Sequence, residues 1–185
     1  AAAPAIRGEA WQTGVAGAPC HAIAAFSVMV LRLKRLELKV PPPALAILIA
    51  GAMWGISLIT PALEAPAYFR IGVAAMIALI GIGSSVAAIV SFRRAGTTIN
   101  PMKPETTSLL VCKGIYSVSR NPMTAGLVLV LVAWAIFLSS GWAWLGPAAF
   151  VLYMNRFQIV PEEKVLSAKF GDRYLAYKSA VRRWL

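Results

Sequence analysis

The sequence predicts an all-α integral membrane protein with about four transmembrane helices and a cytosolic C-terminal helical segment. Three observations support this fold class. Hydrophobic residues make up 59% of the 185 residues and charged residues only 14%, whereas soluble domains carry nearer a quarter charged residues. Four long apolar runs approach the length of a membrane-spanning helix. No segment shows the apolar–polar alternation that would predict a strand.

The charge distribution favours a membrane surface over nucleic acid as the partner. The formal net charge is +11, and the lysines and arginines gather at the ends of the apolar runs. That placement fits anionic lipid headgroups and topology signals. The two cysteines, Cys20 and Cys112, are far apart and form no C-x-x-C pair. They imply neither a disulfide framework nor a metal site, and the oligomeric state stays open.

The first 35 residues read as an N-terminal extension with little order, and residues 36–185 as the membrane domain. Residues 1–28 are rich in Ala, Gly and Pro. The apolar stretch 20–31 is too short to span a membrane and lacks a preceding basic region, so it makes a poor signal peptide. We expect the natural start to lie near Met29.

Apolar runs and turn signals place the spans. The second run contains small residues that suit close helix–helix contact, namely Gly72, Gly81, Gly83, Ser84 and Ser85. The turn 139–141 separates the third and fourth runs, and the polar loop 95–104 is long for a connector. In the amphipathic final segment we expect Gly171 to end one short helix and Asp172 to cap the next. The predicted spans and final segment are residues 44–60, 71–92, 123–138, 145–159 and 162–185.

The basic residues also predict the topology. If both termini are cytoplasmic, four spans leave only Arg70 among the lysines and arginines on the far side. The reverse orientation would place nearly all of them outside, against the positive-inside rule. Loop 93–121 and the C-terminal segment should therefore share the cytoplasmic face.

The polar stretch 113–126 is the first candidate for chemistry. Pro122 suits the first position of a helix, and Asn121 then falls at the N-cap, where its side chain can accept from the next turn. With Arg120 beside it, this helix start favours an anionic group. The alternative is an ordinary membrane-helix start with an interfacial arginine.

Glu162 and Glu163, directly after Pro161, are the second candidate. As first-turn acids they would only complement a helix dipole. As a pair at the membrane surface they could accept from sugar hydroxyls or face a cationic ligand. No Ser/His/Asp or Cys/His arrangement accompanies them, so no catalytic residue is identified. Any chemistry should then come from a cofactor.

Two motifs resemble a known family. The first comprises Gly114, Tyr116, Arg120-Asn121-Pro122-Met123 and Gly126, and the second is the tail Glu162-Glu163, Leu166, Phe170-Gly171, Tyr174 and Tyr177. In this order and spacing they resemble a small bacterial member of the isoprenylcysteine carboxyl methyltransferase and phospholipid methyltransferase superfamily. The loop 96–101 and the end 181–184 are similar too, so the resemblance covers residues 36–185.

The resemblance implies an S-adenosylmethionine-dependent methyltransferase in the inner (plasma) membrane of a bacterium. Its acceptor would be a lipid or small hydrophobic molecule at the cytoplasmic face. By the same resemblance, Glu162 and Glu163 would face the ribose or amino group of the cofactor. The residues that would border its methionyl part are Tyr116, Arg120, Asn121, Pro122 and Gly126.

Two departures and two alternatives accompany this prediction. Where the family often has His, this sequence has Asn121, which cannot titrate. Where the family usually has Tyr, it has Thr124, which removes an aromatic contact.

One alternative is a nicotinamide-dependent membrane reductase, because related folds reduce sterol double bonds. The other is a helical membrane scaffold without enzymatic activity, in which Arg120 and the two glutamates are interfacial anchors.

Overall fold

The computed structural model describes residues 40–95 and 111–184, all within the second of the two units into which the chain divides, residues 36–185. Within these ranges every regular element is helical, as the sequence predicted, and an isolated bridge joins Ala62 to Ser140. The predicted N-terminal extension and most of the 95–104 loop lie outside the described residues.

Helices α2 (Pro42–Ile59) and α3 (Ala67–Arg94) are long and apolar enough to cross a membrane. At about 1.5 Å per residue they measure roughly 27 and 42 Å, against a hydrocarbon core of about 30 Å. Large apolar side chains on both helices, such as Leu48 and Leu79, are exposed. Helix α3 begins four residues before the predicted start, because Pro66 occupies its N-cap and the interfacial residues that follow are helical.

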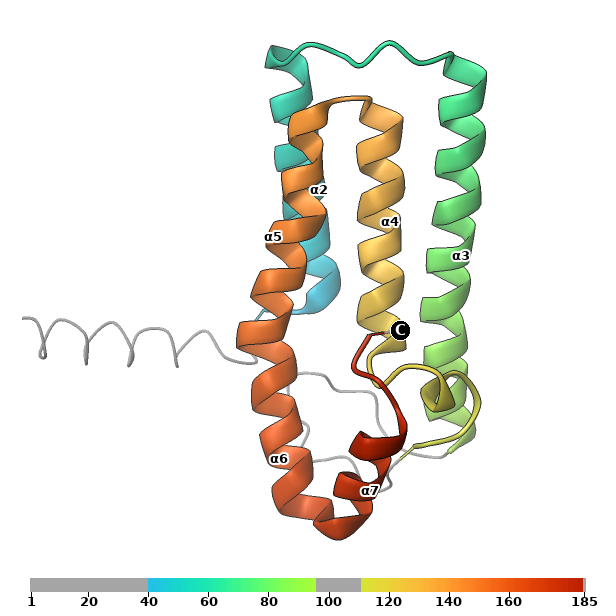
Figure 1. The fold of residues 1–185 in the computed structure, drawn as a ribbon, viewed down its shortest axis with the longest axis vertical. Helices are drawn as coiled ribbons and strands as arrows, with labels where there is room; N and C mark the ends of the chain where they lie inside the picture. The colour runs from blue at the N-terminus through green and yellow to red at the C-terminus, as the bar shows by residue number, and fades with distance from the viewer. Residues whose placement is uncertain (1–39, 96–110, 185) are drawn as a thin grey trace, which may run out of the picture. The chain divides into compact units, whose positions relative to one another are not determined.

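Helices α4 (Pro122–Leu138) and α5 (Leu145–Tyr153) follow, joined by the short helix η3 (Gly141–Trp144). Their connection meets the α2–α3 connection at the same end of the bundle (Figure 1). The Leu63 N–H donates to the Ser139 carbonyl at 2.6 Å, and the Ser139 hydroxyl donates back to the Leu63 carbonyl at 2.8 Å. These bonds hold the two hairpin turns together.

The helix does not stop at Ile159, where the predicted fourth span ends. Helix α5 continues through a π-helical segment, η4 (Met154–Ile159), directly into α6 (Val160–Phe170). In η4 the Val160 N–H donates five residues back, to the Asn155 carbonyl. A wider turn just before Pro161 accommodates a residue that has no N–H and that would clash with the carbonyl four residues back.

The last helix, α7 (Asp172–Ala180), turns back from α6 at Gly171. Gly171 has φ 51°, a left-handed value that glycine adopts without strain, so its predicted role as a helix stop is confirmed. The prediction that Asp172 caps α7 is wrong. Gly171 holds the cap position, Asp172 is the first helical residue, and no side chain caps this helix.

Helices α3 and α4 pack at backbone distance through glycine. A Cβ on Gly81 would lie 2.6 Å from the Gly126 carbonyl oxygen, and one on Gly126 would overlap the Ser85 side chain. The Ser84 hydroxyl adds a hydrogen bond across the interface, donating to the Pro122 carbonyl at 3.0 Å. The close contact predicted for Gly81, Ser84 and Ser85 is therefore confirmed, and it anchors the first turn of α4 against α3. The same prediction is wrong for Gly72 and Gly83, because no described residue lies within 4 Å of a Cβ built on either.

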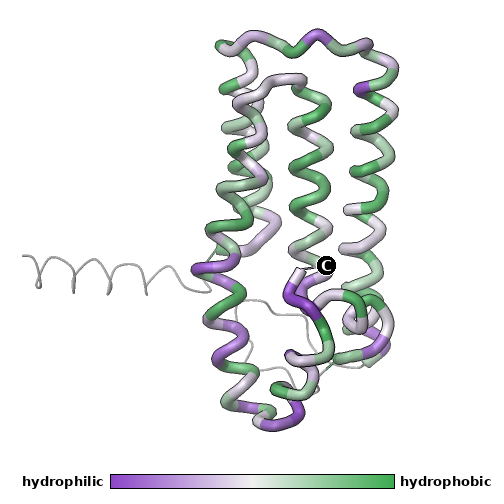
Figure 2. Tube along the Cα trace, in the orientation of Figure 1, coloured by the Kyte–Doolittle hydropathy of each residue, from purple (hydrophilic) through white to green (hydrophobic). Residues whose placement is uncertain are grey.

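Apolar and polar regions divide the molecule along its length. Figure 2 shows hydrophobic residues along α2, α3 and α4 and hydrophilic ones gathered at the end formed by α6 and α7. The apolar core joins α2, α4 and α5 through large side chains that are almost fully buried, namely Met53, Leu131, Phe150, Met154 and Ile159. The polar end therefore stands on a packed apolar bundle.

We expect Gly126→Ala to destabilise the protein by about 1–3 kcal/mol, the range for overpacking a tight contact. The added methyl would collide with Gly81 and Ser85 of α3. Thermal unfolding in detergent measures the effect. Gly83→Ala is the control, because nothing lies within 4 Å of its Cβ position. Equal melting temperatures for the two variants would contradict the close packing of α3 and α4.

Candidate functional site

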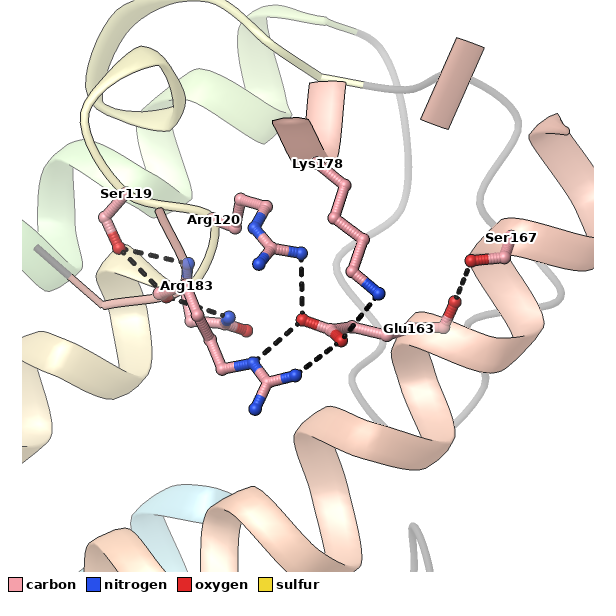
Figure 3. Close-up of polar contacts among 7 residues, drawn as sticks. Ser119, Arg120, Glu163, Ser167, Lys178 and Arg183 are labelled. Atoms are coloured by element: carbon pink, nitrogen blue, oxygen red, sulfur yellow. Dashed lines mark hydrogen bonds and ion pairs between the residues drawn. The ribbon is translucent and has the colours of Figure 1, made fainter. Parts of the chain in front are cut away.

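A cluster of charged and amide side chains lies at the polar end of the bundle, where the segment before α4, helix α6 and the C-terminal residues meet (Figure 3). We call it the polar cluster. Its members come from three separate parts of the chain and are Ser119, Arg120, Asn121, Glu163, Lys178 and Arg183.

Glu163 is the centre of the polar cluster. Its carboxylate accepts from Arg120 Nη1 at 2.9 Å and from both Nε and Nη2 of Arg183, at 3.0 and 2.8 Å. Lys178 Nζ lies 3.7 Å from the same carboxylate. The Glu163 and Arg120 side chains are each only 9% exposed. Two arginines on one buried carboxylate thus join α6 to the segment before α4 and to the C-terminal residues.

These partners determine the ionisation of Glu163. Burial opposes its charged form, but the hydrogen bond from Arg183 and the charges of Arg120, Arg183 and Lys178 outweigh it. The pKa of Glu163 therefore lies below its ordinary value, and the carboxylate stays charged at neutral pH. Three cations around one anion leave an excess of two positive charges in the polar cluster.

Residues 181–184, which we call the C-terminal strap, run along the segment before α4. The Arg120 N–H donates to the Arg182 carbonyl at 3.0 Å. The Arg183 carbonyl accepts from Asn121 Nδ2 at 3.1 Å and from the Ser119 hydroxyl at 3.5 Å. Trp184 packs against the apolar core. The strap is therefore held by backbone and side-chain contacts together.

These contacts correct the predicted role of the Asn121 side chain. Asn121 does occupy the N-cap of α4, and Pro122 is the first helical residue. Its side-chain oxygen accepts no cap hydrogen bond, however, and the side chain is turned to the strap, to which Nδ2 donates. The first turn of α4 is thus left without a side-chain cap and without an acidic residue.

Glu162 differs from its neighbour. It makes no hydrogen bond or ion pair with any residue in the described ranges. Burial, with a smaller contribution from the Glu163 charge, raises the pKa of Glu162 to about 7. The dipole explanation for the two acids fails, because α6 continues η4 and so has no free N-terminal end.

Tyr116 lies on the short helix η2 (Gly114–Ser117) and ties it to two helices. Its ring packs edge-on against Phe92 of α3, with centroids 5.1 Å apart, and its carbonyl accepts from the Tyr177 hydroxyl at 2.7 Å. Burial raises the pKa of Tyr116, and the charge of Glu162 raises it further. Tyr116 and Glu162 are therefore electrostatic neighbours.

The structure thus brings most of the sequence candidates together. Arg120 and Glu163 are in direct contact, and Asn121 reaches the cluster through the Arg183 carbonyl. Gly126 faces α3 at backbone distance, which by itself requires a small residue there. Its place beside the methionyl part of a cofactor stays a prediction.

Sequence reasoning did not name Ser119, Lys178 or Arg183 as site residues, and it quoted Tyr174 only as part of the second motif. Tyr174 is 3% exposed, and burial together with the charge of Glu163 raises its pKa. The resemblance of the end 181–184 to the family was the available signal for Arg183. Its contact with Glu163 was hidden because the two residues are 20 positions apart.

The fold and the cluster define a helical, membrane-type protein with an ion-paired polar site at one end of an apolar bundle. The chain belongs to the phospholipid methyltransferase family, whose profile matches residues 69–173, more than half of the chain, including the first motif and the second as far as Gly171. This confirms the resemblance found in the sequence, and the family implies a membrane methyltransferase.

One relative and the solved structures complete the comparison. The chain is similar to an uncharacterised protein of Haemophilus influenzae, with 51% identity over 63 residues, which are 34% of this chain and the whole of that protein. No solved structure matches the chain.

Glu162 predicts a pH dependence of stability. Because its pKa rises on folding from 4.5 to about 7, the folded state binds the proton more tightly between these values. The free energy of unfolding should therefore fall as pH rises across that window.

We expect Glu162→Gln to remove this decrease and to raise the melting temperature at pH 8 relative to the parent. The lowered pKa of Glu163 acts in the opposite direction, below pH 4.5. An unchanged difference between parent and variant from pH 4.5 to 8 would contradict the assignment.

Proposed function

We propose that this protein transfers a methyl group from S-adenosylmethionine to a lipid or other small hydrophobic acceptor at the cytoplasmic face of the membrane. One observation carries the proposal: Arg120 and Glu163, from the two family motifs, are in contact beside the start of α4. Next to them, Glu162 has no ion pair with any residue that the structure describes. Family membership supports methyl transfer and argues against the reductase and the scaffold.

The excess positive charge of the polar cluster suits the carboxylate of the cofactor's methionyl part. Arg120 Nε is buried and has no hydrogen-bond partner among the described residues. The first turn of α4 has no side-chain cap, so its N–H groups and its dipole favour an anion at the same end. The excess of positive charge around Glu163 adds to this preference.

In this proposal Glu162 and Glu163 have different roles. Glu163 already accepts from two arginines, so it acts by holding Arg120 in place. The Glu162 carboxylate has no partner in ranges 40–95 and 111–184, and we assign to it the amino group or the ribose hydroxyls of the ligand. Tyr116, its electrostatic neighbour, borders this side together with Asn121 and Pro122.

The bound cofactor supplies an electrophilic methyl group on a sulfonium ion. The protein's part is to bind and orient the donor beside an acceptor and to exclude water, since proximity in a dry site can supply much of the rate. The transfer removes the sulfonium charge, so a carboxylate placed directly on the sulfur would stabilise the ground state more than the transition state. We therefore place Glu162 against the amino or ribose groups rather than the sulfur.

Topology completes the proposal. We infer four crossings with both termini cytoplasmic, so that the polar cluster lies at the inner face of a bacterial plasma membrane. The joined turns of the two hairpins would then lie on the outer face. The exposed apolar surfaces of α2 and α3 would face lipid, from which a hydrophobic acceptor could enter.

Purified protein in detergent should bind S-adenosylmethionine and S-adenosylhomocysteine, and not NADPH, in isothermal titration calorimetry. We expect Glu162→Gln to weaken S-adenosylmethionine binding about tenfold or more, the value of one charge-assisted hydrogen bond. Binding by the parent should tighten as pH rises through 7, because the ligand's ammonium favours ionised Glu162.

The control for this experiment is Glu64→Gln, which removes an exposed acid in the α2–α3 connection. It should bind like the parent at every pH. A parent protein that binds neither sulfur compound would refute the proposed cofactor.

Cysteine labelling tests the topology. We expect Gly141→Cys, in a background without Cys20 and Cys112, to react with a membrane-impermeant maleimide in intact cells, because Gly141 is exposed in the α4–α5 connection. Lys164→Cys, on the exposed side of α6, should react only after the cells are opened. The opposite pattern would contradict a cytoplasmic polar cluster.

A further inference from the structure

We propose that Arg183, on the C-terminal strap, is a positioning residue for the donor site: its guanidinium fixes the Glu163 carboxylate, which in turn holds Arg120 toward the ligand. This inference rests on the proposed function and adds a residue that lies outside both family motifs.

The geometry at Glu163 favours Arg183 as the main support. Arg183 reaches both carboxylate oxygens, at 3.0 Å from Nε and 2.8 Å from Nη2, whereas Arg120 reaches one. A two-point arginine–carboxylate contact fixes the plane of the carboxylate as well as its position. Lys178, at 3.7 Å and with 42% of its side chain exposed, offers a single flexible contact.

The backbone of the strap prepares Arg183 for this task. The Arg183 carbonyl accepts from Asn121 and Ser119, and the preceding carbonyl accepts from the Arg120 N–H. Trp184 holds the strap's far end against the apolar core. Because the backbone on both sides of Arg183 is fixed, only the side-chain rotamers lose freedom when the two-point contact forms.

An ordinary surface ion pair does not account for this arrangement. The Arg183 side chain is 34% exposed, and exposed pairs contribute little to stability. Its partner, however, is a carboxylate that is only 9% exposed and is shared with buried Arg120. Without Arg183 the Glu163 carboxylate would keep one well-formed contact and could rotate about it, so Arg120 would lose its fixed position.

The test compares Arg183→Gln with Arg182→Gln. Both variants remove one positive charge from the strap, but only Arg183 contacts Glu163, and Arg182 is exposed. We expect Arg183→Gln to weaken binding of S-adenosylhomocysteine about tenfold, measured by calorimetry under conditions where both variants are folded. Arg182→Gln should stay within about twofold of the parent, and Arg183→Lys should fall between the two, because it restores charge without the two-point contact.

The pH profile separates positioning from a merely structural role. The groups that face Glu163 are Arg120, Lys178, Arg183, the Tyr174 hydroxyl and neighbouring Glu162. Loss of Arg183 should raise the pKa of Glu163. The acid limb of the binding profile, which is the pH range in which affinity for S-adenosylhomocysteine falls as Glu163 is protonated, should therefore move to higher pH in Arg183→Gln. It should not move in Arg182→Gln. Equal affinities and equal acid limbs for the two variants would overturn the proposal.

A second measurement decides the question if the parent does not bind the sulfur compounds. In a double-mutant cycle on thermal unfolding, Arg183→Gln and Arg120→Gln should show non-additive shifts, because both act on one carboxylate. Additive shifts would refute the coupling itself. Absence of binding with a non-additive cycle would refute only the proposed cofactor.

Discussion

The structure of the polar end depends on the carboxylate of Glu163. Three parts of the chain, which lie 43 and 20 residues apart in sequence, meet on this one group. The segment before α4 contributes Arg120, helix α6 carries the carboxylate, and the strap contributes Arg183. The main apolar core is built by residues of α2, α4, η3, α5 and η4 and does not include the three residues of this ionic contact. Ionic contacts therefore perform here what packing performs elsewhere in the bundle.

Such a cluster is not explained by stability alone. Burying charges costs free energy that their attraction often only offsets, and apolar replacements of buried ion pairs are frequently as stable. Breaking one by removal of a partner, in contrast, typically costs about 3–5 kcal/mol. Beside this buried cluster with its excess of positive charge, the Glu162 carboxylate and Arg120 Nε find no partner in the part of the chain that the structure describes. The arrangement is better explained as a site prepared for a charged ligand. The methyltransferase family to which the chain belongs provides a reason for such a site.

Much of this arrangement could be predicted from the sequence. The features that could not be predicted depend on contacts between distant parts of the chain or on unusual helix geometry. The helix starting at Pro122 and the stop at Gly171 follow from local backbone preferences, and the structure confirms both. The side-chain partners were the weak point. Asn121 was expected to cap its own helix, but a carbonyl 62 residues away accepts its amide hydrogen instead. The uninterrupted helix through Pro161 was also missed, because only a π turn lets proline continue there.

The two glutamates also have side-chain surroundings that could not be predicted from the sequence. Their pairing in sequence predicted a shared role, yet the helix turns them into different surroundings. Glu163 meets two arginines, and Glu162 meets none among the described residues. Spacing alone cannot reveal this difference, since it arises from the strap that folds over one of them.

An experimental structure of the protein in lipid with S-adenosylhomocysteine would test the central claim most directly. The account predicts the ligand at the polar end, with its carboxylate at Arg120 and the first turn of α4, its amino or ribose groups at Glu162, and the contacts of Glu163 with both arginines retained. A ligand bound at the opposite end of the bundle, or one that displaces Arg183 from Glu163, would contradict it.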